Sequence, residues 1–230
     1  TIYDTDDQKI VMRDIIKSYN LDPKQWPEKS VLSEISRAKD RLIGYEQYRA
    51  ESLGDYRKET IAKLYGEYQR RLFASNALDF DDLIMKTTEL FTMAMDVLEY
   101  YQDKFKYIMV DEYQDTNIAQ YQLVSLLASK HKNLCVVGDD DQSIYKFRGA
   151  NIENILGFEK DFPGAKVIKL EENYRSTKKI LEAANVVISN NFGRKSKTLW
   201  TANPEGKDIT VNKLNNNYGE AEFVAREIRH

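Results

Sequence analysis

The chain has 230 residues, which is enough for one large domain or two small ones with a sizeable core. Its 34 basic and 37 acidic residues give a formal net charge of −3, so any contact with nucleic acid must be local. One cysteine excludes an internal disulfide and, with only two histidines, argues against a zinc site. No apolar run approaches the roughly 20 residues of a membrane span and no signal peptide is visible, which predicts a cytoplasmic protein.

Residues 1–76 are predicted to form a helical subdomain. A first helix begins at a capping box in 5–8 and ends at Asn20 and Pro23. A second covers about 30–42, and a third, long helix covers about 45–75. The apolar residues that recur at helical spacing are Ile10, Val11, Ile15, Ile16 and Tyr19 in the first helix, Val31, Ile35, Ala38 and Leu42 in the second, and Ile61, Leu64, Tyr65, Tyr68 and Leu72 in the third.

From residue 77 the pattern becomes α/β. Asp79, Asp81 and Asp82 open a helix, where acidic residues suit the helix dipole. Strands are then expected at 107–111, 134–138 and 166–170, alternating with helices at about 117–129, 151–161 and 176–190, which implies a parallel sheet. A strand at 209–214 and a helix at 220–228 begin a further domain. Cys135, inside an apolar run, is expected to be a small core residue.

Residues 107–117, with the sequence Tyr-Ile-Met-Val-Asp-Glu-Tyr-Gln-Asp-Thr-Asn, are the most informative segment. A short apolar strand ends in Asp111 and Glu112, and ligands of open α/β sheets bind at the carboxyl ends of the strands. P-loop ATPases present one such carboxylate to Mg²⁺ and another to the attacking water. The alternative is an acidic turn at the surface.

A second strand, in 134–149, ends in the three carboxylates Asp139 to Asp141 and then Gln142. A glutamine here can orient a water or a phosphate oxygen. Tyr145 and Phe147 follow, interleaved with Lys146 and Arg148. Aromatic rings beside cations form a stacking platform for unpaired bases, worth ~1–3 kcal/mol per base. The alternative places both rings in the core of a short turn.

The third segment, 170–177, again runs from a predicted strand into a helix, with Ser176 as the expected N-cap. Arg175 is placed to meet a γ-phosphate, a role worth ~10³–10⁵ in rate. Tyr174 is placed to stack on a base. The alternative for Arg175 is a salt bridge to Glu171 or Glu172.

Together the three segments resemble the superfamily 1 DNA helicases of the UvrD/Rep/PcrA type. Asp-Glu-Tyr-Gln-Asp-Thr-Asn is similar to their motif II, Gly-Asp-Asp-Asp-Gln-Ser-Ile-Tyr-Lys-Phe-Arg-Gly-Ala to motif III, and Glu-Asn-Tyr-Arg-Ser-Thr to motif IV. The segment 78–83 also resembles a family signature. The resemblance implies a helical 1B-like subdomain at 1–76, the later part of a first RecA-like P-loop NTPase domain at 77–205 and the start of a second at 206–230.

The resemblance also implies ATP and Mg²⁺ as cofactors. Asp111 would hold Mg²⁺ through its water shell, and Glu112 would be the base that activates water. Gln142 would sense the γ-phosphate and couple it to DNA. Tyr174 would stack on adenine, and Arg175 would reach the γ-phosphate.

The implied partner is single-stranded and forked DNA, unwound in the 3′-to-5′ direction. Tyr145 and Phe147 would contact single-stranded bases, and Arg148 would link that strand to the nucleotide site. The family often has Trp where this chain has Phe147, which still offers a ring with less area. The helical subdomain would touch duplex ahead of the fork, and repair or replication proteins are further possible partners.

No Gly-rich phosphate loop (Walker A) of the form G-x-x-x-x-G-K-[ST] occurs in these residues. The only Gly-Lys pair is Gly206-Lys207, with Thr201 in place of the first glycine and Asp208 in place of the Ser/Thr. Without the loop's backbone amides and lysine, the phosphates are not cradled. The sequence, which also lacks the later helicase motifs, is therefore expected to be an internal fragment that is inactive on its own.

Two alternatives remain. In the first alternative, the chain is a non-catalytic single-stranded DNA-binding module. Its local positive charge would come from Lys146, Arg148, Lys178, Lys179, Arg194, Lys195 and Lys197. In the second alternative, the chain is a protein-interaction scaffold that uses the helix at 45–75 as its docking face.

Overall fold

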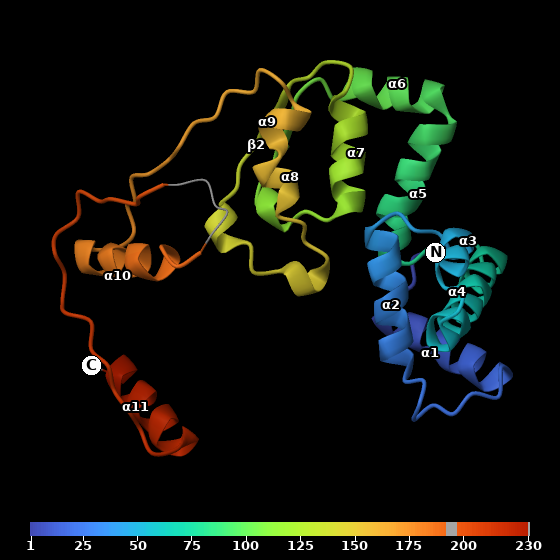
Figure 1. Cartoon of the computed structure of the whole chain (residues 1–230), viewed down its shortest axis with the longest axis horizontal. Coiled ribbons are helices and arrows are strands. Elements are labelled where there is room, and N and C mark those ends of the chain that lie inside the picture. The colour runs from blue at the N-terminus through green and yellow to red at the C-terminus, as the bar shows by residue number, and fades with distance from the viewer. Residues whose placement is uncertain (192–196, 230) are drawn as a thin grey trace. The chain divides into compact units, whose positions relative to one another are not determined.

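The computed structural model of the chain describes residues 1–191 and 197–229 (Figure 1). The chain divides into two compact units, Thr1–Ala165 and Lys166–His230, which are described separately below. Among the described residues, no helix is both long enough and apolar enough to cross a membrane.

The first half of unit one is helical, as predicted. It consists of α1 (Thr5–Ser18), α2 (Glu28–Asp40), α3 (Tyr45–Glu51) and α4 (Tyr56–Ala74) (Figure 1). Helices α1, α2 and α4 contribute buried apolar faces to one core, which also holds Trp26, Ile43 and Ala77, and Tyr48 of α3 packs against it. The helical residues of this core are Met12, Ile15, Ile16, Val31, Ile35, Ala38, Ile61, Leu64, Tyr65, Tyr68 and Leu72. This core confirms most of the predicted inward residues.

Several helix details differ from the sequence prediction. The expected helix at 45–75 is broken between α3 and α4, where Gly54 takes a φ of +86°, a conformation that glycine adopts at little cost. The first helix is capped by Asp4, one residue earlier than predicted, because its carboxylate accepts the backbone N–H groups of Asp6 and Asp7. Ile10 is 56% exposed, and Met12 takes a core position instead.

The chain segment before α1 and the segment after α4 are hydrogen-bonded to each other. Leu78 N–H donates to the carbonyl of Thr1 at 2.9 Å, and Tyr3 N–H donates to the carbonyl of Leu78 at 2.8 Å. Ile2 and Leu78 form an isolated parallel bridge. The chain segments before α1 and after α4 therefore run side by side.

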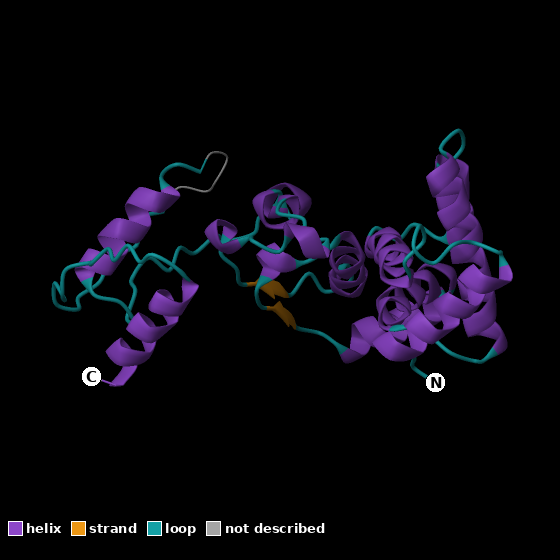
Figure 2. Ribbon diagram, turned by 90° about the horizontal axis from the view of Figure 1, so that it is seen from below, coloured by secondary structure: helices purple, strands orange, loops and turns teal. Residues whose placement is uncertain are grey.

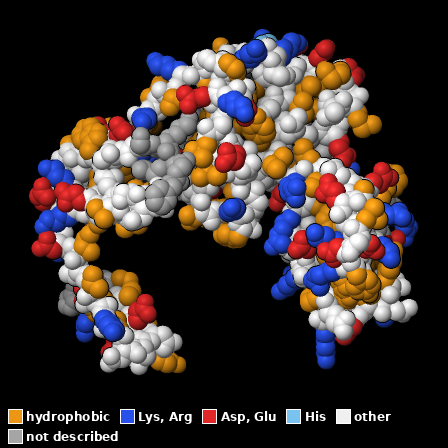
Figure 3. All heavy atoms as spheres, in the orientation of Figure 1, with side chains coloured by type: hydrophobic (Ala, Val, Ile, Leu, Met, Phe, Trp, Pro, Cys, Tyr) orange, Lys and Arg blue, Asp and Glu red, His pale blue; other side chains and the backbone are white. Residues whose placement is uncertain are grey.

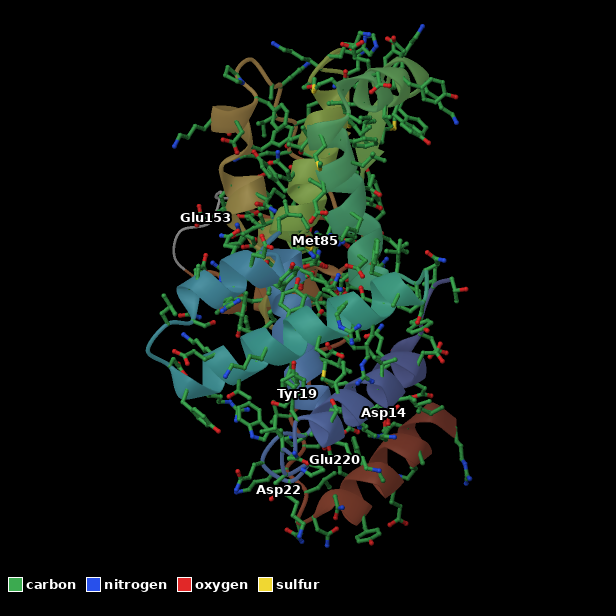
Figure 4. All side chains as sticks on the ribbon, turned by 90° about the vertical axis from the view of Figure 1, so that its right-hand side faces the viewer. Asp14, Tyr19, Asp22, Met85, Glu153 and Glu220 are labelled. Atoms are coloured by element: carbon green, nitrogen blue, oxygen red, sulfur yellow. The ribbon has the colours of Figure 1, made fainter. Side chains whose placement is uncertain are left out.

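The second half of unit one is α/β. After α5 (Phe80–Met93) and α6 (Met95–Lys104) come β1 (Ile108–Val110), α7 (Ile118–Ala128) and β2 (Leu134–Val136). The two strands are parallel neighbours, as predicted, with Val110 opposite Val136 (Figure 2). Helix α5 packs on α7 and on α2, and Met85 of α5 is buried where these helices meet (Figure 4).

The two strands are less buried than predicted. Tyr107 is 76% exposed and Met109 is 80% exposed, and Cys135, opposite Met109, is exposed rather than a core residue. A parallel sheet buries a face only when another layer covers it, and no described element covers this one. The single helix expected at 151–161 is two short ones, α8 (Glu153–Leu156) and α9 (Phe158–Asp161), which meet at Gly157.

Unit two contains α10 (Lys178–Ile188) and α11 (Asn217–Arg229), near the two predicted helices. The strands expected at 166–170 and 209–214 do not form among the described residues, and only Glu172 and Trp200 make an isolated bridge. Their apolar side chains are exposed, with Leu170 at 78% and Val211 at 93%. A strand is stable only beside a partner strand, and these segments have none within the described ranges.

Candidate functional site

The parallel pairing brings two of the three predicted segments to one edge of the sheet. Beyond the paired strands, Val137 N–H donates to the carbonyl of Val110 at 2.8 Å, and Tyr113 N–H donates to the carbonyl of Val137 at 2.9 Å. The chain leaving β1 carries Asp111 and Glu112, and the chain leaving β2 carries Asp139 to Gln142. This is the arrangement that the sequence predicts for a phosphate-directed site.

Glu112 has an unusual backbone conformation. Its φ of 50° and ψ of 40° place it in the left-handed region, which costs a non-glycine residue roughly 1–2 kcal/mol. The Asp111 carboxylate accepts the Glu112 N–H at 2.9 Å and helps to hold this turn. Both side chains are exposed. Such strained residues concentrate at functional sites, where the surrounding structure fixes them.

Gln114 connects the two carboxylate-bearing segments. Its side-chain Nε2 donates to Glu112 Oε2 at 2.7 Å, and its Oε1 accepts the backbone N–H of Asp139 at 2.9 Å. The residue is only 1% exposed. Gln114 thus fixes the Glu112 carboxylate relative to the end of β2. The sequence pattern does not identify Gln114 as a site residue. The one indication is that a polar residue lies two positions after the Asp-Glu pair.

Because Gly138 has no side chain, the side-chain amide of Gln114 can pack directly against its backbone. A Cβ atom at this position would lie 2.6 Å from Gln114 Oε1 and 2.8 Å from a terminal carbon of Ile155. Any side chain would therefore displace the amide that joins the two segments. The glycine is required by close packing, since it is not among the glycines with positive φ.

The three consecutive aspartates form a compact cluster at the same edge. Asp139 caps the short 3₁₀ turn Asp140–Gln142 by accepting the Asp141 N–H at 3.0 Å, and its other oxygen accepts Gln142 Nε2 at 2.7 Å. One carboxylate oxygen from each aspartate lies within 4.8 Å of the others. Carboxylate oxygens such as these are the donors that Mg²⁺ prefers.

Tyr145 and Phe147 lie together after the aspartate cluster. Their ring centroids are 5.8 Å apart with the planes tilted by 49°, and the two residues are 37% and 71% exposed. Phe147 is therefore not a core residue. The backbone of Arg148 ends the 3₁₀ turn Lys146–Arg148, but its side chain lies outside the described part of the structure.

A buried ionic cluster lies at the start of α5, where the sequence suggested only a helix-dipole effect. Lys39 Nζ is 2.6 Å from Asp79 Oδ2 and 2.9 Å from Asp82 Oδ1, and all three side chains are almost fully buried. The Tyr68 hydroxyl donates to the same Asp79 oxygen at 3.0 Å. Burial and these carboxylates raise the pKa of Tyr68 well above its ordinary value. The cluster joins α2, α4 and α5.

Tyr174 and Arg175 belong to unit two. The Tyr174 hydroxyl donates to Glu172 at 2.8 Å, and this hydrogen bond to a carboxylate raises the pKa of Tyr174. Asn173 accepts the backbone N–H of Arg175 at 3.0 Å, and α10 is preceded by Thr177 rather than the predicted cap Ser176. Among the described residues, the Arg175 side chain forms no ion pair with the neighbouring glutamates. Arg194 and Lys195 lie outside the described residues.

Two family models match the chain. Residues 1–163 match the model of the UvrD/REP helicase N-terminal domain, and residues 168–230 match that of the UvrD-like helicase C-terminal domain. The chain belongs to the UvrD/REP helicase family. The break between the two matches falls at the division between the two compact units. The finer division at residues 76 and 205 stays a prediction.

Among its UvrD-family relatives, the chain is 54% identical to the ATP-dependent DNA helicase PcrA of Bacillus subtilis (strain 168) over 228 residues. It is 56% identical to PcrA of Staphylococcus aureus (strain NCTC 8325 / PS 47) over the same length. Each match covers 99% of this chain but only 31% of the relative. The relatives are therefore much longer than the sequence described here.

Proposed function

We propose that this chain is a segment of an ATP-dependent DNA helicase that couples ATP hydrolysis to 3′-to-5′ translocation on single strands and to duplex unwinding. The observation that carries the proposal is the sheet edge, where Gln114 joins the exposed carboxylate of Glu112 to the end of the neighbouring strand. Family membership and the printed names of the relatives support it.

In this proposal Glu112 is the general base that takes a proton from the attacking water. Its carboxylate is exposed and is oriented by a buried amide, so it can face a bound nucleotide while its own position is fixed. Gln142 senses the γ-phosphate from the second strand end. Tyr174 stacks on the adenine, and Arg175 neutralises charge on the γ-phosphate.

The ATP-bound Mg²⁺ would supply charge neutralisation for the phosphates. Asp111 would hold it through the ion's water shell, since carboxylate oxygens suit that ion. The neighbouring Asp139 carboxylate is already used by Asp141 N–H and by Gln142, so its role is to position Gln142.

The proposed DNA partner is single-stranded and forked DNA. The exposed pair Tyr145 and Phe147 offers two rings to unpaired bases, with Arg148 linking that strand to the nucleotide site. Basic and acidic side chains are intermingled on the visible face of α1 to α4 (Figure 3), so contacts with DNA there would be local. A cytoplasmic location and repair or replication proteins as further partners complete the proposal.

The test compares Glu112→Gln with wild type in a longer protein that carries this chain and a phosphate loop. DNA-stimulated ATP hydrolysis should fall by ~10²–10⁴, because a general base contributes that much. Glu99→Gln, an exposed glutamate of α6, is the matched control and should retain full activity. Equal turnover in the two variants would contradict the assignment. The 230-residue chain alone is expected to show no Mg²⁺-dependent turnover.

A non-catalytic single-stranded DNA-binding module remains the second candidate, favoured by the exposed aromatic pair. It predicts salt-dependent binding of a labelled oligonucleotide by the 230-residue chain, weakened by Tyr145→Ala with Phe147→Ala. The scaffold alternative stays a prediction, and its proposed docking face at 45–75 consists of α3 and α4 rather than one long helix.

A further inference from the structure

Asp40 ends helix α2 in the helical half of unit one, yet its carboxylate reaches both carboxylate-bearing segments. Its Oδ1 accepts a hydrogen bond from Asn117 Nδ2 at 2.6 Å. Its Oδ2 lies against Gly149, where an added Cβ would be only 2.7 Å away and where φ is +87°. Asn117 ends the segment that carries Glu112, and Gly149 ends the segment that carries Gln142.

The two residues that Asp40 contacts are themselves fixed to their segments. Asn117 is the N-cap of α7, and its Oδ1 accepts the Gln120 N–H at 2.8 Å, so only its amide nitrogen is directed to Asp40. Just beyond Gly149, Asn151 N–H donates to the carbonyl of Thr116 at 3.0 Å, and Asn154 Nδ2 donates to the same carbonyl at 3.1 Å. The two segment ends are therefore hydrogen-bonded directly to each other.

The other side of Asp40 is anchored just as firmly. The preceding residue, Lys39, is held by the buried carboxylates Asp79 and Asp82 at 2.6 and 2.9 Å. The last turn of α2 cannot shift without breaking this cluster or carrying α5 with it. Asp40 is thus a short rigid link between the helical half and the two segment ends.

The surroundings of Asp40 also carry an electrostatic cost. Asp40 is half buried beside another carboxylate, Asp81 of α5, and burial together with that neighbour raises the pKa of Asp40 to about 6. Asn117 is its one side-chain hydrogen-bond donor among the described residues. Burial and Asp81 thus disfavour the ionised carboxylate, while its hydrogen bond with Asn117 acts in the opposite direction.

We propose that Asp40 is a positioning residue that ties the ends of 111–117 and 138–149 to helix α2, so that a displacement of the helical half moves both segments together. Its significance for ATP hydrolysis rests on the proposed function. The physical link itself does not depend on the proposed function, because it is defined by contacts within unit one.

Amide hydrogen exchange of the 230-residue chain tests the link without ATP or DNA. In Asp40→Ala, the amides of 113–120 and 149–154 should exchange about tenfold faster, since one hydrogen bond to a carboxylate is lost. Asp40→Asn keeps an acceptor oxygen and should restore protection. Glu34→Ala, which removes a partly exposed carboxylate that pairs with Arg37 on the same helix, is the matched control and should leave these amides unchanged.

A second variant keeps the test decisive if Asp40→Ala unfolds the chain. Asn117→Ser retains a good N-cap but lacks the amide donor, so it should expose the same two segments while α1 and α4 stay protected. The link is overturned if Asn117→Ser leaves the protection of 149–154 unchanged, or if Asp40→Asn exchanges as fast as Asp40→Ala. Because no nucleotide is present, neither outcome depends on whether the longer protein hydrolyses ATP.

Discussion

Gln114 is the residue whose chemistry organises the sheet edge. A neutral amide carries both a donor and an acceptor, so one side chain satisfies the Glu112 carboxylate and the Asp139 backbone N–H at once. No carboxylate could do both, since it lacks the donor. Gly138 makes room for this amide, and the two residues form one packing unit.

Replacing Gln114 by alanine should cost the 230-residue chain about 1–3 kcal/mol of unfolding free energy, because the Asp139 N–H loses its acceptor and a buried side chain is removed. Urea denaturation measures this loss. Gln25→Ala, at an exposed glutamine in the loop before α2, is the control and should change stability by less than about 0.5 kcal/mol. Equal losses in the two variants would show that Gln114 does not join the segments.

Asp40 gives a pH-dependent prediction. Its pKa rises from 3.8 to about 6 on folding, so between these values the folded chain holds more protons than the unfolded chain and the Asp40 contribution to stability falls as pH rises. The penalty is complete above pH 6. Asp40→Asn should therefore gain stability relative to wild type on going from pH 4 to pH 7, by on the order of 1 kcal/mol after screening by water.

Urea unfolding at several pH values measures that difference. Asp14→Asn, at an exposed position of α1 (Figure 4), removes a carboxylate of the same type and should show a flat difference across the range. A flat difference for Asp40→Asn as well would mean that the Asp40 carboxylate is not destabilised in the fold.

At the scale of elements, the sequence predicts helices better than strands. An amphipathic helix satisfies its own backbone and shows its buried face by spacing alone, which is why the core faces of α2 and α4 were predicted correctly. A strand depends on a neighbour that periodicity does not reveal. The apolar runs at 107–110 and 134–136 pair with each other, whereas those at 166–170 and 209–214 have no partner strand among the described residues.

In the candidate site, the sequence predicts what local motifs determine but not the contacts between distant residues. Sequence motifs predicted that Glu112 and Gln142 would emerge at one sheet edge, because parallel strands share that edge. The contacts of Gln114 and Asp40 could not be predicted, since they join residues 25 and 77 positions apart. The aspartates at 79 and 82 have the pattern of a solvated first helical turn, and their buried partner lies 40 residues earlier.

The Lys39 cluster is the strongest link between elements, so its loss should be costly. Lys39→Met should lower the free energy of unfolding by about 3–5 kcal/mol, because it leaves Asp79 and Asp82 buried without their cation. Lys63→Met, at an exposed position of α4, is the control and should have little effect in the same urea experiment. A loss below 1 kcal/mol for Lys39→Met would contradict the burial of the cluster.

At the scale of the whole molecule, the two units differ in how much core they hold. Nearly all the buried apolar side chains belong to unit one, and Leu181 is the one in the described part of unit two. Hydrophobic burial supplies most of the stabilisation of a fold, so unit two has little to hold it together by itself. The two units should therefore unfold at different denaturant concentrations.

The two tryptophans allow this to be measured, because Trp26 lies in unit one and Trp200 in unit two. Trp26→Phe leaves a reporter of unit two, and Trp200→Phe leaves a reporter of unit one. The fluorescence of Trp200 should change at a clearly lower urea concentration than that of Trp26. If both fluorescence transitions instead coincide with the far-UV circular dichroism transition of each variant, the two units unfold together in one cooperative step.

The bridge between Ile2 and Leu78 has an evolutionary consequence. Because the segments flanking α1 to α4 run side by side, the intervening four helices can lengthen, shorten or be exchanged as a cassette while the strands at 108 and 134 keep their register. Changes within the four helices would therefore leave the sheet edge that carries Glu112 and Gln142 undisturbed. The tie through Asp40 and Lys39 limits that freedom to cassettes whose second helix still ends in the same two side chains.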